Sequence, residues 1–116
     1  MTVKACYELM GADYEGVLGR LRSEGLIRKF AKKFPDDGSF RSLKDSLAQG
    51  NGEEAFRAAH TLKGVCQSLG FDNLYKVSFD ITEKLRDRNT EGCEELLEKV
   101  EDQYKKTIDA IQRMDD

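Results

Sequence analysis

Hydrophobic residues recur along this chain at the three- and four-residue spacing of amphipathic helices, and turn-forming residues separate the segments. β-Branched alternation, the pattern of strands, is scarce, and helix-forming residues dominate. The predicted helices cover residues 2–10, 13–34 (broken or bent at Gly25), 39–49, 53–69, 72–85 and 90–111.

Residues typical of helix ends mark the same boundaries. Thr2, Asp13, Asp72 and Thr90 are predicted N-caps, and Ser39 is predicted to open the third helix. Gly70 is expected to close the helix 53–69 as its C′ residue. The last three residues, 114–116, are expected to protrude or fray beyond the final helix.

Short turns between long amphipathic helices predict antiparallel neighbours. A length of 116 residues suits one domain and is too short for two separate cores. We therefore expect a single all-α domain over residues 1–116. Its core, residues 25–113, is predicted to be an antiparallel four-helix bundle formed by the last four helices, with the N-terminal helical extension, residues 1–24, packed across it.

Charge and hydropathy narrow the function classes. The chain has 19 Lys and Arg against 22 Asp and Glu, a net charge of -3, which gives no reason to expect nucleic acid as a partner. No apolar run reaches the ~20 residues of a membrane span, so we expect no membrane partner and a cytoplasmic monomer. Met1, followed directly by a helical pattern, favours a free-standing protein, although a domain cut from a larger protein would look the same.

Three cysteines are spread along the chain at Cys6, Cys66 and Cys93. Their spacing offers neither a disulfide framework nor, with one histidine available, a good zinc site, so no metal site is expected. We interpret them as small residues packed between helices. A metal or redox protein built on these thiols is the less favoured alternative.

The helix 53–69 carries the chain's one histidine, His60. At about 100° per residue, one face of this helix is apolar and is predicted to form the core, and His60 lies on the opposite face. Phe56, Arg57, Lys63, Gly64 and Gln67 lie near it on that wet side. Periodicity alone would still allow an ordinary surface histidine. The predicted core stripe is Ala55, Ala58, Leu62, Val65 and Leu69, flanked by Ala59 and Cys66.

Gly64 changes this interpretation, because a glycine inside a helix costs about 1 kcal/mol relative to alanine. Packing within the domain does not explain a glycine on the wet face, so we infer that a partner approaches the backbone beside His60. Lys63 leans back over the histidine and could hold a phosphoryl group on the ring. Gln67 lies too far along the helix to reach the imidazole and is expected to contact the partner.

An exposed imidazole is mostly uncharged at neutral pH and is a competent nucleophile toward phosphorus. The sequence has no nucleotide-binding loop and no acidic cluster for a metal ion. The domain could therefore carry a phosphoryl group without being an enzyme that takes it from ATP. The phosphoryl donor and the Mg²⁺ ion that such transfers use are expected to come with the partner, and no cofactor of its own is expected.

The run from Ala58 to Gly70, AAHTLKGVCQSLG, resembles the signature of histidine-containing phosphotransfer (HPt) domains, H-x-L-K-G followed by L-G. The similarity extends over about residues 25–113. The resemblance implies an α-helical bundle in which His60 accepts a phosphoryl group from a receiver-domain aspartate and passes it to another receiver in a phosphorelay. It also implies that Lys63 stabilises the phosphoryl group, that Gly64 allows close approach, and that the partners are response-regulator receiver domains and hybrid histidine kinases.

One position departs from that family. Many HPt domains have a Gln or Glu on the neighbouring helix that fixes the tautomer of the imidazole. If the helices on either side of Phe71 form a hairpin, position 60 faces Thr82, and Glu83 lies beside it. We name Thr82 first and Glu83 second for this role.

Two other hypotheses stay open at this point. The domain could be a docking module that binds receiver or kinase domains without being phosphorylated. Phe56 and Arg57 favour docking in either case, because an aromatic side chain beside the histidine is a plausible anchor. The third hypothesis is the metal or redox protein that uses the cysteines.

Overall fold

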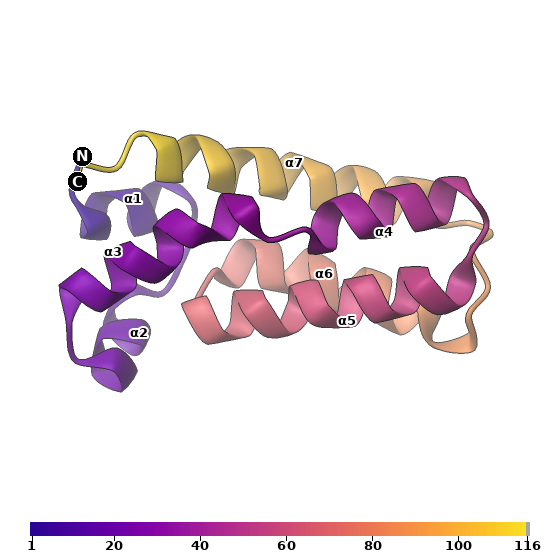
Figure 1. The fold of residues 1–116 in the computed structure, drawn as a ribbon, viewed down its shortest axis with the longest axis horizontal. Coiled ribbons are helices and arrows are strands. Elements are labelled where there is room, and N and C mark those ends of the chain that lie inside the picture. Colours follow the sequence, from indigo (N-terminus) through magenta and orange to yellow (C-terminus); the bar gives the residue numbers. More distant parts are fainter. Residues whose placement is uncertain (116) are drawn as a thin grey trace.

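Helices account for all the regular structure in residues 1–115, which are the residues that the computed structural model describes, and no strand occurs among them. Figure 1 labels the α-helices, and two 3₁₀ turns complete the helical elements in chain order. They are α1 (Val3–Leu9), α2 (Tyr14–Leu21), α3 (Glu24–Lys33), the 3₁₀ turn η1 (Phe34–Asp36), α4 (Ser39–Ala48), α5 (Gly52–Leu69), α6 (Asp72–Lys84), the 3₁₀ turn η2 (Leu85–Asp87) and α7 (Glu94–Gln112).

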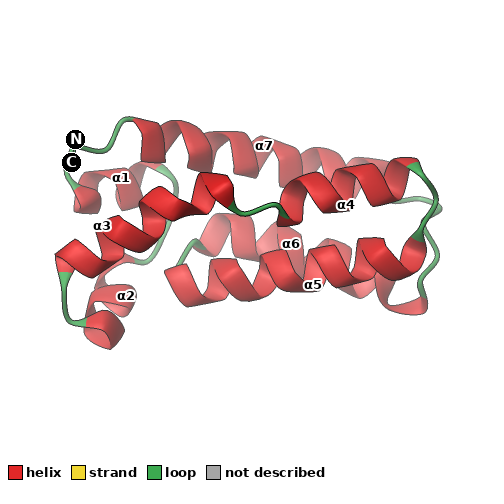
Figure 2. Ribbon diagram, in the orientation of Figure 1, coloured by secondary structure: helices red, strands yellow, loops and turns green. Residues whose placement is uncertain are grey.

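The last four α-helices form an antiparallel bundle, as predicted. Each packs against two others, so that α4 and α6 both contact α5 and α7. The helices α1 to α3 gather at one end of this bundle, next to both chain termini (Figure 1). Figure 2 shows that short loops join the bundle helices, which is why consecutive helices run in opposite directions. The predicted fold class is therefore confirmed.

A chain of aromatic rings joins the N-terminal helices to the bundle. The ring centroids of Tyr7 and Phe71 are 5.6 Å apart, and those of Phe71 and Phe34 are 5.2 Å apart in an edge-to-face arrangement. Phe34 in turn lies 5.8 Å from Tyr104, which stacks on Phe40 at 4.3 Å. Such pairs contribute roughly 0.5–1.5 kcal/mol beyond their buried area. The N-terminal helices and the bundle therefore share one core.

Several predicted helix ends are confirmed. The side chain of Thr2 accepts a hydrogen bond from the backbone N–H of Ala5 at 3.0 Å, and Asp13 accepts one from Gly16 at the same distance. Gly70 ends α5 in the left-handed region with φ of 72°. A side chain at Gly70 would collide with Val17, whose Cγ2 lies 2.2 Å from the position of a Cβ atom.

Other helix ends differ from the prediction. The segment 14–34 divides at Arg22, which adopts a left-handed conformation, and Ser23 caps the new helix, so Gly25 lies inside α3 instead of at the break. Asp72 is the first residue of α6, not its cap. Ser39 opens α4 as predicted. Thr90 caps nothing, because turns in which the side chains of Asp87 and Asn89 accept backbone N–H bonds delay α7 until residue 94.

The C-terminal end is more firmly held than predicted. Met114 is only 4% exposed. The carboxylate of Asp115 lies 2.6 Å from the amino group of Met1, and the backbone N–H of Asp115 donates to the carbonyl of Met1 at 2.7 Å. These contacts contradict the expectation of fraying for residues 114 and 115. Asp116 lies outside the described residues.

The N-terminal segment also binds the C-terminal end of α5. The hydroxyl of Tyr7 donates to the carbonyl of Leu69 at 2.8 Å, and the backbone N–H of Asp13 donates to Gly70 at 2.7 Å. Arg20 donates to the carbonyl oxygens of Gln67 and Ser68 at 3.3 and 2.9 Å. Carbonyls at a helix end have no partner within the helix, so these donors complete the end of α5.

We predict that Tyr7→Phe lowers the free energy of unfolding by about 1–2 kcal/mol, because the buried carbonyl of Leu69 loses its donor. Urea denaturation followed by circular dichroism measures the change. Tyr75→Phe is the matched control, since the hydroxyl of Tyr75 has no hydrogen bond within the described residues, and it should change stability by no more than about 0.5 kcal/mol. Equal losses in the two variants would contradict the capping role of Tyr7.

Candidate functional site

The face that α5 turns to the core determines what its other face presents. Asn51 caps this helix, accepting a bond from the N–H of Glu54 at 3.2 Å. The core face is made of small and apolar side chains. Ala55, Ala59, Leu62 and Cys66 on this face are fully buried, and Ala58 and Leu69 are nearly so. Val65, predicted for the same stripe, is only half-buried.

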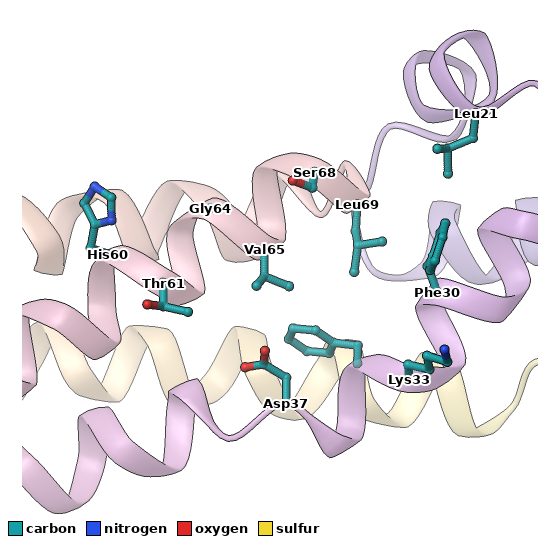
Figure 3. Close-up of a pocket in the computed structure, with 11 residues that line it drawn as sticks. Leu21, Phe30, Lys33, Asp37, His60, Thr61, Gly64, Val65, Ser68 and Leu69 are labelled. Atoms are coloured by element: carbon teal, nitrogen blue, oxygen red, sulfur yellow. The ribbon is translucent and has the colours of Figure 1, made fainter.

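His60 lies on the exposed side of α5, as the periodicity predicts. Its nearest aromatic neighbour is Phe56, whose ring centroid is 5.9 Å from that of the imidazole. Among residues 1–115, no side chain forms a hydrogen bond with either ring nitrogen. Figure 3 shows the ring standing out from α5. Both nitrogens are therefore accessible to a visiting group.

Gly64, one turn after His60, faces open space. A Cβ atom built on Gly64 would meet no atom outside its own helix backbone within 4 Å. Packing in this domain therefore does not require a glycine here, in agreement with the reasoning from sequence. Lys63 is half-buried, and its ammonium group lies 5.6 Å from the ring centroid of Phe79 on α6.

An open apolar cleft of about 700 Å³ begins beside His60 and Gly64 and runs along α5. Figure 3 shows Val65, Leu69 and Phe30 pointing into the space between α5 and α3. The cleft ends at the N-terminal helices, where Leu21 of α2 forms part of its wall. Phe30 is 38% exposed and contributes apolar surface to the lining of this cleft.

The opposite side of His60 is basic. The guanidinium of Arg88 stacks on Phe56 with its central carbon 3.8 Å from the ring centroid, and that of Arg86 lies 5.7 Å away. Phe56 is therefore a half-buried platform under an arginine, not the exposed anchor that we expected. Arg57 is exposed and pairs with Glu54 at 3.1 Å.

Thr82 does not reach His60. It is fully buried, and its hydroxyl donates to the carbonyl of Ser78 within α6 at 2.6 Å. The hairpin register pairs positions along α5 and α6 but does not fix the rotation of α6 about its own axis. This rotation turns Ser78 and Thr82 into the core. The structure therefore does not support Thr82 as the residue that orients the imidazole.

Glu83 lies on the exposed side of α6 and is bound by Arg86, whose Nε donates to its carboxylate at 3.0 Å. This hydrogen bond lowers the pKa of Glu83, and the positive charge of Lys63 contributes to the same shift. Glu83 thus lies within the electrostatic reach of two cations of the site, although it makes no hydrogen bond with the imidazole.

Gln67 is exposed in the last turn of α5, beyond Gly64. The residues that reasoning from sequence missed are Phe79, Arg88 and Phe30. Phe79 offered a signal, since it is an aromatic residue on the polar side of its helix and is 41% exposed. Arg88 offered none, because its contact with Phe56 depends on the conformation of a loop.

The sequence model of the Hpt domain family matches residues 26–114. The chain belongs to this family. Hpt domains are helical bundles that act as phosphocarriers in phosphorelays, so a phosphotransfer role applies to this chain. No curated protein and no solved structure gives a significant match.

Two further observations bear on the other function classes. No helix within residues 1–115 of this Hpt domain is long and apolar enough to cross a membrane. The same residues contain no group of three or more His, Cys, Asp or Glu side chains arranged to hold a metal ion.

All three cysteines of the Hpt domain are buried and free. Burial raises the pKa of the Cys66 thiol from 9.0 to about 12 and that of Cys6 to about 11. It also raises the pKa of Cys93. Because the thiolate is the reactive form, the native thiols are expected to be inert.

We predict that iodoacetamide at about pH 8 leaves the native protein unmodified and alkylates the three cysteines once urea unfolds it. Because burial favours the neutral thiol of Cys66, its contribution to stability is complete below about pH 9, where an unfolded thiol stays protonated. This contribution decreases as the pH rises toward 12. Mass spectrometry counts the modified residues. Rapid alkylation of a native thiol would favour the redox hypothesis instead.

Proposed function

We propose that this Hpt domain accepts a phosphoryl group on His60 from the phosphoaspartate of a receiver domain and passes it to a second receiver domain. The single observation that carries the proposal is the pairing of His60 with Gly64. An exposed imidazole whose nitrogens make no hydrogen bond within residues 1–115 stands in the middle of a helix, one turn before a glycine at which a Cβ atom would face open space.

The chemistry requires a nucleophile and little else from this chain. The unprotonated nitrogen of the imidazole attacks phosphorus, and a P–N bond forms as the P–O bond to the aspartate breaks. The electron pair of that bond leaves with the aspartate carboxylate. The proton on the other ring nitrogen can then pass to water, which leaves a neutral phosphoimidazole ring. Transfer to the next receiver reverses these steps.

Lys63 is the residue of this chain that we assign to the phosphoryl group. In the resting state its ammonium lies over Phe79 at 5.6 Å. A cation–π contact on an exposed ring such as that of Phe79 contributes about 0.5–1 kcal/mol, whereas a hydrogen bond to a charged group contributes about 1.5–3 kcal/mol. We therefore expect Lys63 to leave Phe79 and contact the phosphoryl oxygens when they arrive.

The receiver domain docks, in this proposal, over Gly64 and the apolar cleft. The cleft begins at His60 and is lined by Val65, Leu69 and Phe30, so a partner's apolar side chains would find a surface beside the reacting atoms. The partner supplies Mg²⁺ from its own acidic site. A hybrid histidine kinase that carries a receiver domain is one such partner, and Gln67 and Arg57 lie where the rim of a docked domain would reach.

We predict that incubation with a receiver domain phosphorylated by acetyl phosphate labels the wild-type protein with an acid-labile, base-stable phosphate. His60→Gln should abolish the label, because His60 is the one histidine of the chain. The measurement is ³²P transfer followed by gel electrophoresis, with peptide mass spectrometry at neutral pH to locate the modification.

The same experiment separates transfer from docking. Labelling that persists in His60→Gln would contradict the proposed role of His60. If the receiver domain binds wild type and His60→Gln equally and neither protein is labelled, the domain is a docking module, the alternative that the apolar cleft favours.

We predict that Gly64→Gln slows phosphotransfer from the receiver domain at least about tenfold, because a side chain then occupies the space the partner needs; a loss of about 1.4 kcal/mol in the transition state suffices. The fold should remain and gain up to about 1 kcal/mol, since glycine is a poor helix former. Single-turnover transfer and urea denaturation give the two quantities.

Gly19→Gln is the matched control for this variant. Gly19 also lies inside a helix, α2, and a Cβ atom there would meet no atom outside its own helix backbone within 4 Å, but Gly19 does not line the cleft. Both variants should gain stability, and only Gly64→Gln should transfer slowly. Equal transfer rates would remove Gly64 from the docking surface.

A further inference from the structure

A second, smaller cavity of about 280 Å³ lies on the basic side of His60. Phe56 and three arginines, Arg57, Arg86 and Arg88, line it together with the histidine and Glu53. Lys63 follows His60 by about one turn on α5. The cavity beside the imidazole is therefore lined by basic side chains from α5, from η2 and from the loop that follows η2.

Arg88 is held by several other contacts, and Arg57 lies partly outside this cavity. Arg88 stacks on Phe56 at 3.8 Å, and its Nε donates to Glu53 at 3.4 Å. Its backbone is fixed as well, since its φ is 64° and its carbonyl oxygen lies 1.7 Å from where a Cβ atom on Gly52 would be. Arg57 pairs with Glu54 and also lines a separate cavity towards α4.

Arg86 is differently placed. Its guanidinium lies 5.7 Å from the ring centroid of Phe56, and the imidazole of His60 lies 5.9 Å from the same ring. Its only acidic partner within the described residues is Glu83, three residues earlier on α6, and both side chains are largely exposed. An exposed ion pair of this kind is weak and exchanges readily with other partners.

We propose that Arg86 is a second phosphoryl-binding residue, which exchanges Glu83 for the phosphoryl oxygens when His60 is phosphorylated. This inference rests on the proposed function of His60. A phosphoryl group carries up to two negative charges and three acceptor oxygens, and the planar guanidinium can donate two parallel hydrogen bonds to it. Glu83 offers one negative charge in water. The exchange therefore favours the phosphorylated ring.

Glu83 is the resting partner of this arrangement. It accepts hydrogen bonds from Arg86, and the positive charge of Lys63 also stabilises its carboxylate. When both cations turn to the phosphoryl group, Glu83 loses them together. The two sides of the site are thus linked through one carboxylate, and removal of that carboxylate should affect the phosphoryl group in the opposite sense to removal of Arg86.

The test uses the full chain phosphorylated by potassium phosphoramidate, a small donor that transfers its phosphoryl group to histidine nitrogen and releases ammonia without a partner protein. The proteins are wild type, R86Q, E83Q, E83Q/R86Q and the control R41Q, which breaks an exposed pair with Asp45 on α4, away from the site. A ³¹P NMR titration measures the proton affinity of the phosphorylated imidazole of His60, which depends on the charges around its dianionic phosphoryl group.

We expect R86Q to raise this proton affinity about threefold, the order of one exposed charge contact, because the dianion loses a cation. E83Q should lower it, since Arg86 is then free of its competitor, and this effect should shrink in E83Q/R86Q. R41Q should match wild type. If the Arg86–Glu83 pair only stabilised the fold, R86Q and E83Q would change thermal stability to the same extent, and the proton affinity in the ³¹P NMR titration would equal that of wild type.

Two outcomes overturn the inference, and they are distinguishable. If wild type gives no phosphohistidine signal while its circular dichroism is native, the proposed function fails and this inference fails with it. If the signal forms and titrates identically in wild type, R86Q and R41Q, His60 keeps its proposed role and Arg86 has no contact with the phosphoryl group.

Discussion

The burial of one face of α5 is the constraint on which the rest of this structure depends. Ala55, Ala59, Leu62 and Cys66 have no exposed surface, and two of these side chains are only methyl groups, so the neighbouring helices pack close to the α5 backbone. A rotation of α5 by one residue, about 100°, would bring His60 toward the core and expose apolar side chains. The position of the imidazole is therefore a consequence of packing on the far side of the same helix.

A rigid backbone and exchangeable charges are combined around the histidine. Asn51 caps one end of α5, and donors from the N-terminal segment bind the carbonyls at the other. The cations near His60 are held differently, by a ring face for Lys63 and by an exposed carboxylate for Arg86. Such contacts are weak in water. The backbone can thus keep one geometry while the charges respond to what the imidazole carries.

The sequence predicts best what is determined within a single helix. Periodicity placed His60 on the exposed face and Gly64 beside it, and Gly70 was identifiable as the end of α5 because of its residue type. The rotation of α6 was not predictable in the same way. Ser78 and Thr82 are polar, yet both are fully buried, so the apolar pattern understates the width of the core face. Arg22 ends a helix in the left-handed conformation, which arginine as a residue type does not predict. Arg88 contacts Phe56 only because of the conformation of the loop after η2.

The family match begins at residue 26, whereas the contacts that complete α5 come from residues before it. A fragment trimmed to the matched region would lack Tyr7, Asp13 and Arg20, and the carbonyls at the end of α5 would be left to the solvent. It would also lose Leu21 and with it one wall of the cleft. The family region therefore begins later in the chain than the segment that forms the cleft and completes the end of α5. A fragment made for binding studies has to retain α1 and α2.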